Sequence, residues 1–279
     1  MASLFNRPAA PPRPLPRGEP PYDDSDEIDD GAAGKMSFLE HLDELRKRLI
    51  GSAIALGAGF LIALAFITPI FDFIMRPLYE KLPPDSHLIY TEPTEAFMLR
   101  LKIAALVGAM LAVPVIMWQL WLFISPGLYK HEKRFAVPFI LMSTVFFAGG
   151  AVFSHYVVFP WAWVFLASFS TDYLLMMPKI SSVFSLYAKM ILAFGVIFEM
   201  PTVVFFLARM GLVTARFLAR HLKYAVLIIF IAAAILTPTG DVVTQSLMAG
   251  PMFGLYLLSI GIAWVFGKRK PRDSQTGNA

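Results

Sequence analysis

The chain has 279 residues, of which 57% are hydrophobic and only 16% are charged. Its mean hydropathy of +0.63 excludes an ordinary soluble domain and indicates a polytopic membrane protein built from helices. The formal net charge is +4 and there is no cysteine, which excludes disulfides, thiolate metal sites and cysteine nucleophiles.

Residues 1 to 34 are a polar tail ahead of the first apolar segment. The proline-rich stretch APPRPLPRGEPP is followed by a run of acidic residues and then by GAAG. This composition buries too little apolar surface to fold, so we predict a disordered region over residues 1–35. The tail lacks an apolar core with a small-residue cleavage site, so a signal peptide is not predicted.

The stretch from Ser37 to Ile50, SFLEHLDELRKRLI, predicts an amphipathic helix that lies at a membrane surface and continues into the first span. Ser37 and Glu40 form a capping box at its start. Apolar residues recur at helical spacing on one face. The opposite face carries two acid–base pairs four residues apart, in the favoured order: Asp43 with Lys47, and Glu44 with Arg48.

Six apolar segments have the composition of membrane spans. They run from about Leu49 to Phe71, from Phe97 to Ile124, from Phe135 onward, from Val183 to Ala208, from Tyr224 to Leu236 and from Val242 to Trp264. The fifth has 13 residues, whereas about 20 are needed to cross a bilayer. Its hairpin with the sixth must therefore thin the bilayer or lean on a partner, unless the helix ends extend one turn further.

A seventh apolar segment, from Val157 to Phe169, contains Pro160 and is too short to cross a hydrocarbon core of about 30 Å. Six spans with both termini in the cytoplasm place most basic residues on the inner side, whereas a seventh span would expose two basic clusters outside. We therefore predict an all-α, six-span membrane domain over residues 36–266. Val157 to Phe169 is predicted to lie along the outer surface as a cap, and residues 267–279 form a basic cytoplasmic tail.

Two acids lie among basic residues on the predicted inner side: Glu44, and Glu132 in KHEKR. A carboxylate accepts a guanidinium through two parallel hydrogen bonds, so such a pair suits a ligand with two adjacent arginines. The pattern alone favours local ion pairs instead, because exposed pairs are common and contribute little. Those pairs are Glu44 with Arg48, and Glu132 with Lys133 or Arg134.

Glu199, in FGVIFEMP, lies ten residues before Arg209, or about 15 Å along a helix, and therefore near the bilayer midplane. An ionisable group is costly there, which favours a functional role over a structural one. Pro201 removes a backbone donor and predicts a bend. A proton-coupled small-solute transporter using Glu199 is the alternative function, although the two halves show no convincing repeat.

The loop between the last two spans carries a polar patch. It comprises Thr237, Thr239, Asp241, Thr244 and Gln245. Such groups hydrogen-bond neighbouring helices within a bilayer, so internal packing and docking of a partner helix fit equally well. The sequence has no glycine-rich phosphate loop, catalytic triad or metal-ligand cluster, so no enzymatic site, cofactor or metal is predicted.

Five motifs stand in a fixed order: HLDELRKRL, RPL…LP, WLFISPGLYKHEKR from Trp121 to Arg134, FGVIFEMP, and LTP…DVVTQ. Their order and spacing resemble those of TatC, the multispanning core of the twin-arginine protein translocase, over about Met36 to Trp264. The resemblance implies a glove-shaped bundle of six helices in the bacterial inner membrane, with both termini cytoplasmic, short helices 5 and 6, and no enzymatic activity. One departure is the longer connection from Pro238 to Asp241.

The resemblance also implies binding of the twin-arginine signal peptides of folded cargo. It implies a scaffold for single-span TatA- and TatB-type partners, self-association in a larger complex, and export driven by protonmotive force. The matching positions are Glu44, Arg46, Phe123 and Glu132 for the signal peptide, Glu199 for a membrane-buried acid, Thr237 and Gln245 for partner docking, and Pro77 and Asp241 for loop shape.

Overall fold

The computed structural model describes residues 38–80, 87–124, 136–171, 176–237 and 241–267, which are mostly helical. Five helical stretches among them are long and apolar enough to cross a membrane. They are Leu39–Ala65, Glu95–Ile124, Ala136–Ala167, Ile180–Met210 and Val242–Phe266. A shorter apolar helix, Leu222–Leu236, is the sixth. The predicted all-α membrane fold with six helical segments is therefore confirmed.

The first span ends earlier than predicted. Helix α1 covers Phe38–Ala65 and includes the amphipathic stretch, and after a turn at Phe66 helix α2 covers Ile67–Tyr79. Pro77 lies inside α2, so its placement in a loop was wrong. Proline within a helix costs about 3 kcal/mol. Burial of Ile74, Met75 and Leu78 on the same helix outweighs this, at about 1.5–3 kcal/mol for each side chain.

The second span is the single helix α3. The third span consists of three consecutive helical segments and is longer than predicted. Helix α3 covers Glu95–Ile124, and the next span consists of α4 (Ala136–Phe153), a π-helical turn η3 (Ser154–Val158) and α5 (Phe159–Ala167) without a break. The prediction of a separate surface cap is therefore wrong, although the segment adds no seventh span. Pro160 stands in the first turn of α5, where a missing N–H is tolerated, and the π turn lets the helix continue through it.

The fourth span is divided where Pro201 predicts a bend. Helix α6 covers Ile180–Ile197 and α7 covers Met200–Met210, with a turn at Phe198 and Glu199 between them. Proline provides no N–H for the carbonyl one turn earlier, so the ladder is interrupted at this point. The prediction is confirmed, and Glu199 stands at the N-cap position of α7 without a capping hydrogen bond from its side chain.

The last two spans differ in length. After α8 (Ala215–Arg220), helix α9 covers Leu222–Leu236 with 15 residues and α10 covers Val242–Phe266 with 25. At 1.5 Å per residue these reach about 22 Å and about 37 Å. Only α9 is shorter than the hydrocarbon core of about 30 Å, so the prediction that both are short holds for α9 alone.

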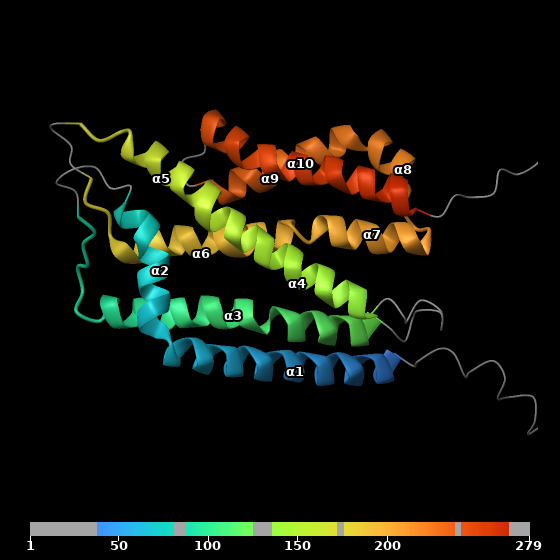
Figure 1. Ribbon diagram of the computed structural model, residues 1–279, viewed down its shortest axis with the longest axis horizontal. Helices are drawn as coiled ribbons and strands as arrows, with labels where there is room; N and C mark the ends of the chain where they lie inside the picture. Colours follow the sequence, from blue (N-terminus) through green and yellow to red (C-terminus); the bar gives the residue numbers. More distant parts are fainter. Residues whose placement is uncertain (1–37, 81–86, 125–135, 172–175, 238–240, 268–279) are drawn as a thin grey trace, which may run out of the picture. The chain divides into compact units, whose positions relative to one another are not determined.

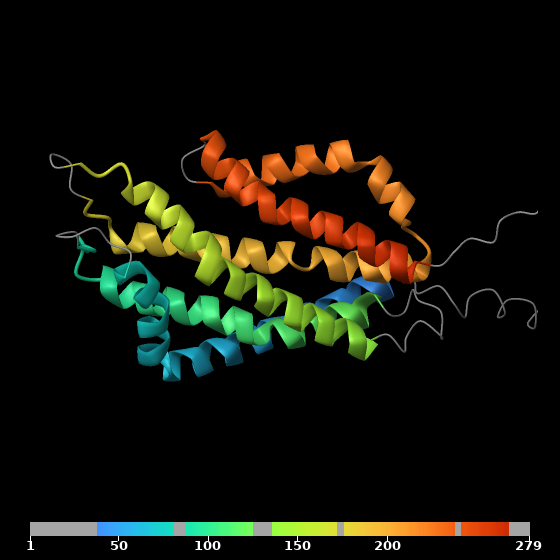
Figure 2. The ribbon, with the colours of Figure 1, turned by 45° about the horizontal axis from the view of Figure 1, so that its top comes forward.

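The helix ends gather at two levels. Figures 1 and 2 show the end of α3, the start of α4 and the ends of α7 and α10 at one end, with α2, α5 and the start of α6 at the opposite end. We call the first the inner end, because the sequence predicts that it faces the cytoplasm, and the second the outer end.

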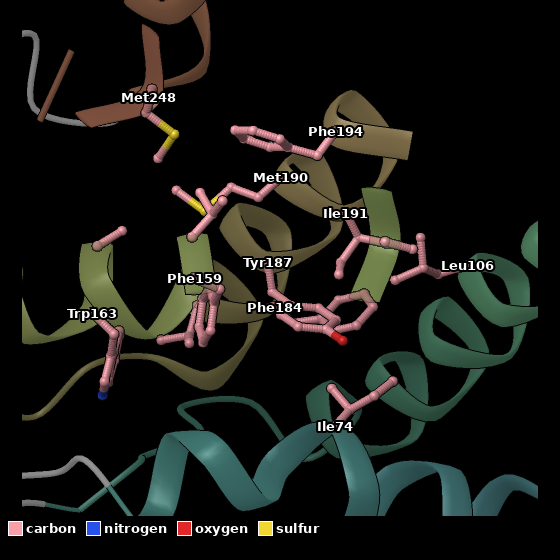
Figure 3. Packing of buried hydrophobic residues seen from close by; sticks show 14 of the residues in the cluster. Ile74, Leu106, Phe159, Trp163, Phe184, Tyr187, Met190, Ile191, Phe194 and Met248 are labelled. Carbon is pink, nitrogen blue, oxygen red and sulfur yellow. The ribbon is translucent and has the colours of Figure 1, made fainter. Parts of the chain in front are cut away.

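The core is built around α6 (Figure 3). Its buried side chains Phe184, Tyr187, Met190, Ile191 and Phe194 meet apolar residues of α2, α3, α5 and α10. Helix α4 approaches α6 so closely that a Cβ at Gly150 would collide with the carbonyl oxygen of Phe194. Interiors packed at this density hold helices in a defined register, which fixes the residues that face Glu199.

Candidate functional sites

The charged face of α1 forms the predicted local ion pairs. Arg48 donates from Nε and Nη2 to Oε1 of Glu44 at 3.1 and 2.6 Å, and Lys47 lies 2.7 Å from Asp43. The Glu44 side chain is 15% exposed, whereas that of Asp43 is 55% exposed. Both Arg48 donors use one oxygen, so within the described residues Oε2 of Glu44 accepts no hydrogen bond.

Close contacts between α1 and α3 set the position of Glu44 along the bundle. A Cβ at Gly51 would meet the Gln119 side chain, and a Cβ at Gly59 would meet the Gly108 carbonyl, so the two helices run antiparallel in this register. Glu44 lies about two turns beyond Gly51, and Phe123 one turn beyond Gln119, in the same direction. The register therefore brings Glu44 and Phe123 to the inner end.

An aromatic cluster holds the inner end of α3. The Trp121 ring lies 5.2 Å from that of Phe139 on α4 and 5.3 Å from that of Phe206 on α7, and the last two are 4.7 Å apart. Tilted and edge-to-face pairs at these separations add to apolar burial. This cluster fixes the helix end that carries Phe123, whereas Arg46 is exposed on α1. The predicted Glu132 lies outside the described residues.

Glu199 lies among buried hydroxyl groups. Ser143 of α4 and Thr202 of α7 are the polar residues beside its carboxyl group, and both are fully buried. Glu199 Oε1, Ser143 Oγ and Thr202 Oγ1 have no hydrogen-bond partner among the described residues. A buried polar group without a partner costs about 1–3 kcal/mol. The three groups thus form a polar site that the fold leaves incomplete.

The polar patch between α9 and α10 is engaged within the chain. Asp241 caps α10, accepting from the Thr244 N–H at 2.8 Å and the Thr244 hydroxyl at 2.7 Å. Gln245 donates from Nε2 to the carbonyl oxygen of Phe230 on α9 at 2.8 Å, and the Thr237 hydroxyl donates to Ala234 O at 3.3 Å. The patch was predicted to serve either internal packing or docking of a partner helix, and these contacts are internal packing.

Two polar contacts have no evident signature in the sequence. The buried His155 ring in η3 places Nδ1 3.0 Å from the Tyr187 hydroxyl and stacks on Phe73 of α2. At the outer end Glu95 accepts hydrogen bonds from the backbone of Thr91 and of Ser181. The first contact left no signal, because a single histidine in an apolar run does not reveal its partner. The second joins residues 86 positions apart.

Among the described residues, no group of three or more His, Cys, Asp or Glu side chains is arranged to hold a metal ion.

Comparison with known proteins gives a consistent result. The profile of the family described as Sec-independent protein translocase protein (TatC) matches residues 40–251. A TatC protein of Desulforapulum autotrophicum is 46% identical over 241 residues, which is 86% of this chain and 89% of the relative. One of Koribacter versatilis is 44% identical over 246 residues, with 86% and 90% covered.

Solved structures agree with the sequence relatives. A crystal structure described as the twin-arginine translocase receptor TatC has 40% identity and a TM-score of 0.70, covering 80% of this chain and 97% of that one. A second crystal structure of such a receptor, in DDM, has 38% identity and a TM-score of 0.71.

Proposed function

Because the chain belongs to the TatC family and is thus a non-enzymatic, multi-pass component of a bacterial Sec-independent protein translocase, we propose that it is the receptor for twin-arginine signal peptides. The observation that carries this proposal is the state of Glu44. Its carboxylate is largely shielded, oriented by Arg48 through one oxygen, and placed at the same end as Phe123.

Recognition of paired arginines follows from this geometry. Oε2 of Glu44 is available to one ligand guanidinium, and Glu132, just beyond the end of α3 in the sequence, receives the second. Phe123 offers a ring for the apolar part of a guanidinium or for the residue after the pair. Arg46 repels further cations, so it favours binding of the arginine pair in a single register. The planar guanidinium of arginine directs its N–H donors at Oε2 in a fixed geometry that the flexible lysine ammonium cannot reproduce, which gives selectivity for arginine over lysine.

Binding of a twin-arginine peptide and of its twin-lysine version tests the proposal. Wild-type protein is expected to prefer the arginine peptide by about tenfold or more, since hydrogen bonds to charged groups contribute about 1.5–3 kcal/mol each. Glu44→Lys with Glu132→Lys should abolish that preference. Asp43→Lys is the matched control, because Asp43 is an exposed acid on the same helix. If the double reversal retains wild-type binding of both peptides, the receptor assignment fails.

The apolar part of the signal is proposed to enter the bundle towards Glu199. A polar site without internal partners suits a guest backbone or a proton, and we infer that Glu199 is a proton-sensitive element in export driven by protonmotive force. Transport by Glu199→Gln should lose its dependence on pH or stop, whereas Glu199→Asp should retain part of it. Undiminished transport by Glu199→Gln across the pH range would remove the proton role. Membership in a translocase family disfavours the alternative of small-solute transport.

Partner helices of the TatA and TatB type are proposed to pack against α9. At about 22 Å this helix is shorter than the hydrocarbon core, so it gains from a neighbour that shields its ends or from a locally thinned bilayer. Thr237 and Gln245 lie at the end of this helix and at the start of the next, where the amide oxygen of Gln245, whose Nε2 is held by Phe230 O, accepts from a partner's polar group. Gln245→Leu should reduce co-purification of the single-span subunits, whereas Ser246→Ala, which removes an exposed hydroxyl at the next position of α10, is the control.

The topology proposed for the chain is that of an inner-membrane protein with both termini in the cytoplasm. Residues 1–35 and 267–279 are the proposed cytoplasmic extensions of the 36–266 membrane domain, and further copies of the chain assemble with it in the larger complex. Labelling of single cysteines, introduced one at a time at Ala2 and Ser274, tests the orientation. Modification by an impermeant reagent in intact cells at either position contradicts it.

A further inference from the structure

A small charged pocket lies at the outer end, between the start of α3 and the start of α6. Its volume is about 200 Å³, below the roughly 300 Å³ at which sites for drug-sized ligands begin. Two acids and two lysines line it, namely Glu92, Glu95, Lys102 and Lys179, with Met98 and Leu99 as an apolar wall. Opposite charges around so small a volume suit a compact group that itself carries both signs.

Two of these four charged residues, Glu95 and Lys179, stabilise the shape of the pocket. Glu95, whose side chain is 6% exposed, accepts from the N–H of Thr91 at 3.0 Å and of Ser181 at 3.2 Å, and Lys179 Nζ lies 3.5 Å from its Oε2. Backbone hydrogen bonds between Ile89 and the segment at 178–180 close the same wall, at 3.1 and 2.9 Å. The pocket is therefore built from two outer segments that are fastened to each other.

The other two charges are available to a ligand. Lys102 is exposed and forms no ion pair within the described residues. Glu92 has a side chain that is 70% exposed, and its one ion pair among the described residues is a long contact of 3.9 Å to Lys179. One free ammonium and one weakly engaged carboxylate thus face the same volume.

The depth of Lys102 follows from two helices. Lys102 lies 19 residues from Trp121 of the inner aromatic cluster, or about 28 Å along α3. On the α6–α7 span Lys189 lies 20 residues from Arg209, or about 30 Å. Measured from these two inner residues, both lysines therefore stand at the same depth, about one hydrocarbon-core thickness of roughly 30 Å away. Glu92 precedes α3 and lies further out, where the long Lys102 side chain also reaches.

We propose that this pocket binds the headgroup of a zwitterionic phospholipid that carries a primary ammonium group. Lys102 meets the phosphate at the hydrocarbon edge and Glu92 accepts hydrogen bonds from the ammonium group further out, which is the order of charges along the membrane normal in such a lipid. The exposed Met98 contacts the first part of the acyl chains. A quaternary ammonium has no N–H to donate, and a glycerol headgroup has no positive charge, so both should bind less well.

Native mass spectrometry of the full-length protein in detergent, with phosphatidylethanolamine, phosphatidylcholine and phosphatidylglycerol of identical acyl chains, tests the proposal. The ethanolamine lipid should bind about tenfold more tightly than the other two. Lys102→Gln and Glu92→Gln should each remove that preference. Lys189→Gln is the matched control, since it removes an exposed lysine at the same depth outside the pocket. Glu92→Lys should turn the preference towards the glycerol lipid.

Each other outcome contradicts the proposal. Equal binding of ethanolamine and choline lipids would mean that the Glu92 carboxylate accepts no hydrogen bond from the ammonium group. Stronger binding of the glycerol lipid by the wild type reveals a simple anion site. Equal effects of Lys102→Gln and Lys189→Gln indicate lipid that surrounds the whole protein rather than lipid held in this pocket. Circular dichroism of every variant identifies loss of helical structure.

Discussion

The crossing of α1 and α3 at Gly59 and Gly108 underlies the proposed receptor site, because it determines where Glu44 lies relative to Phe123. A Cβ added to Gly59 would approach the Gly108 carbonyl oxygen far more closely than the 3.0 Å limit that real Cβ atoms respect. The added atom would meet backbone, which cannot rotate away. The change Gly59→Ala therefore forces the two helices apart.

Gly57, two residues away, is the matched control against which the loss of stability in Gly59→Ala is measured. A Cβ at Gly57 would meet nothing within 4 Å, so Gly57→Ala gains helix propensity of about 1 kcal/mol without a clash. Gly59→Ala gains the same propensity but adds overpacking of about 1–3 kcal/mol. The difference between the two variants is then about 1–3 kcal/mol. At about 2–4 °C for each kcal/mol, this is a difference of about 2–12 °C in Tm.

Thermal unfolding of both variants in the same detergent measures this difference, and binding of the twin-arginine peptide measures its functional consequence. Gly59→Ala should melt below Gly57→Ala and bind the peptide more weakly, because Glu44 moves relative to the end of α3. Equal melting temperatures would mean that the helices do not approach closely at this point. The placement of Glu44 beside the inner end of α3 would then lose its support.

Three further predictions concern single hydrogen bonds. Asp241→Ala should lower the free energy of unfolding by about 1 kcal/mol through loss of the α10 cap, whereas Asp241→Asn should retain most of that stability. Thermal melting of the two variants tests this, and equal melting temperatures would contradict the capping role. Gln245→Leu should cost about 1 kcal/mol by releasing Phe230 O, and an unchanged melting temperature would count against that bond. Tyr187→Phe should cost about 1–3 kcal/mol because buried His155 loses its partner, and a wild-type denaturant midpoint would refute this.

Local chemistry accounts for what the sequence could predict. The break between α6 and α7 follows from one proline, and the Glu44–Arg48 and Asp43–Lys47 pairs follow from their i,i+4 spacing. These features depend on residues within a turn of one another. The same is true of the six apolar segments, whose existence is set by composition along a short window.

Features that depend on distant parts of the chain were not predictable. Helix α2 continues through Pro77 because three of its side chains are buried by other helices, and the π turn at Ser154–Val158 carries the third span past Pro160. Neither outcome has a local signature. Similarly, Glu199 was recognisable as a buried acid, but no pattern in the apolar α4 segment identifies Ser143 as the hydroxyl that faces it.

The central claim, that Glu44 receives a ligand guanidinium, is tested most directly by a double-mutant cycle. The affinities of wild type and Glu44→Gln are measured for a peptide with two arginines and for peptides in which each arginine in turn is lysine. The account predicts a coupling energy of about 1.5 kcal/mol or more between Glu44 and one of the two arginines, and little with the other. Additive effects at both peptide positions would contradict it.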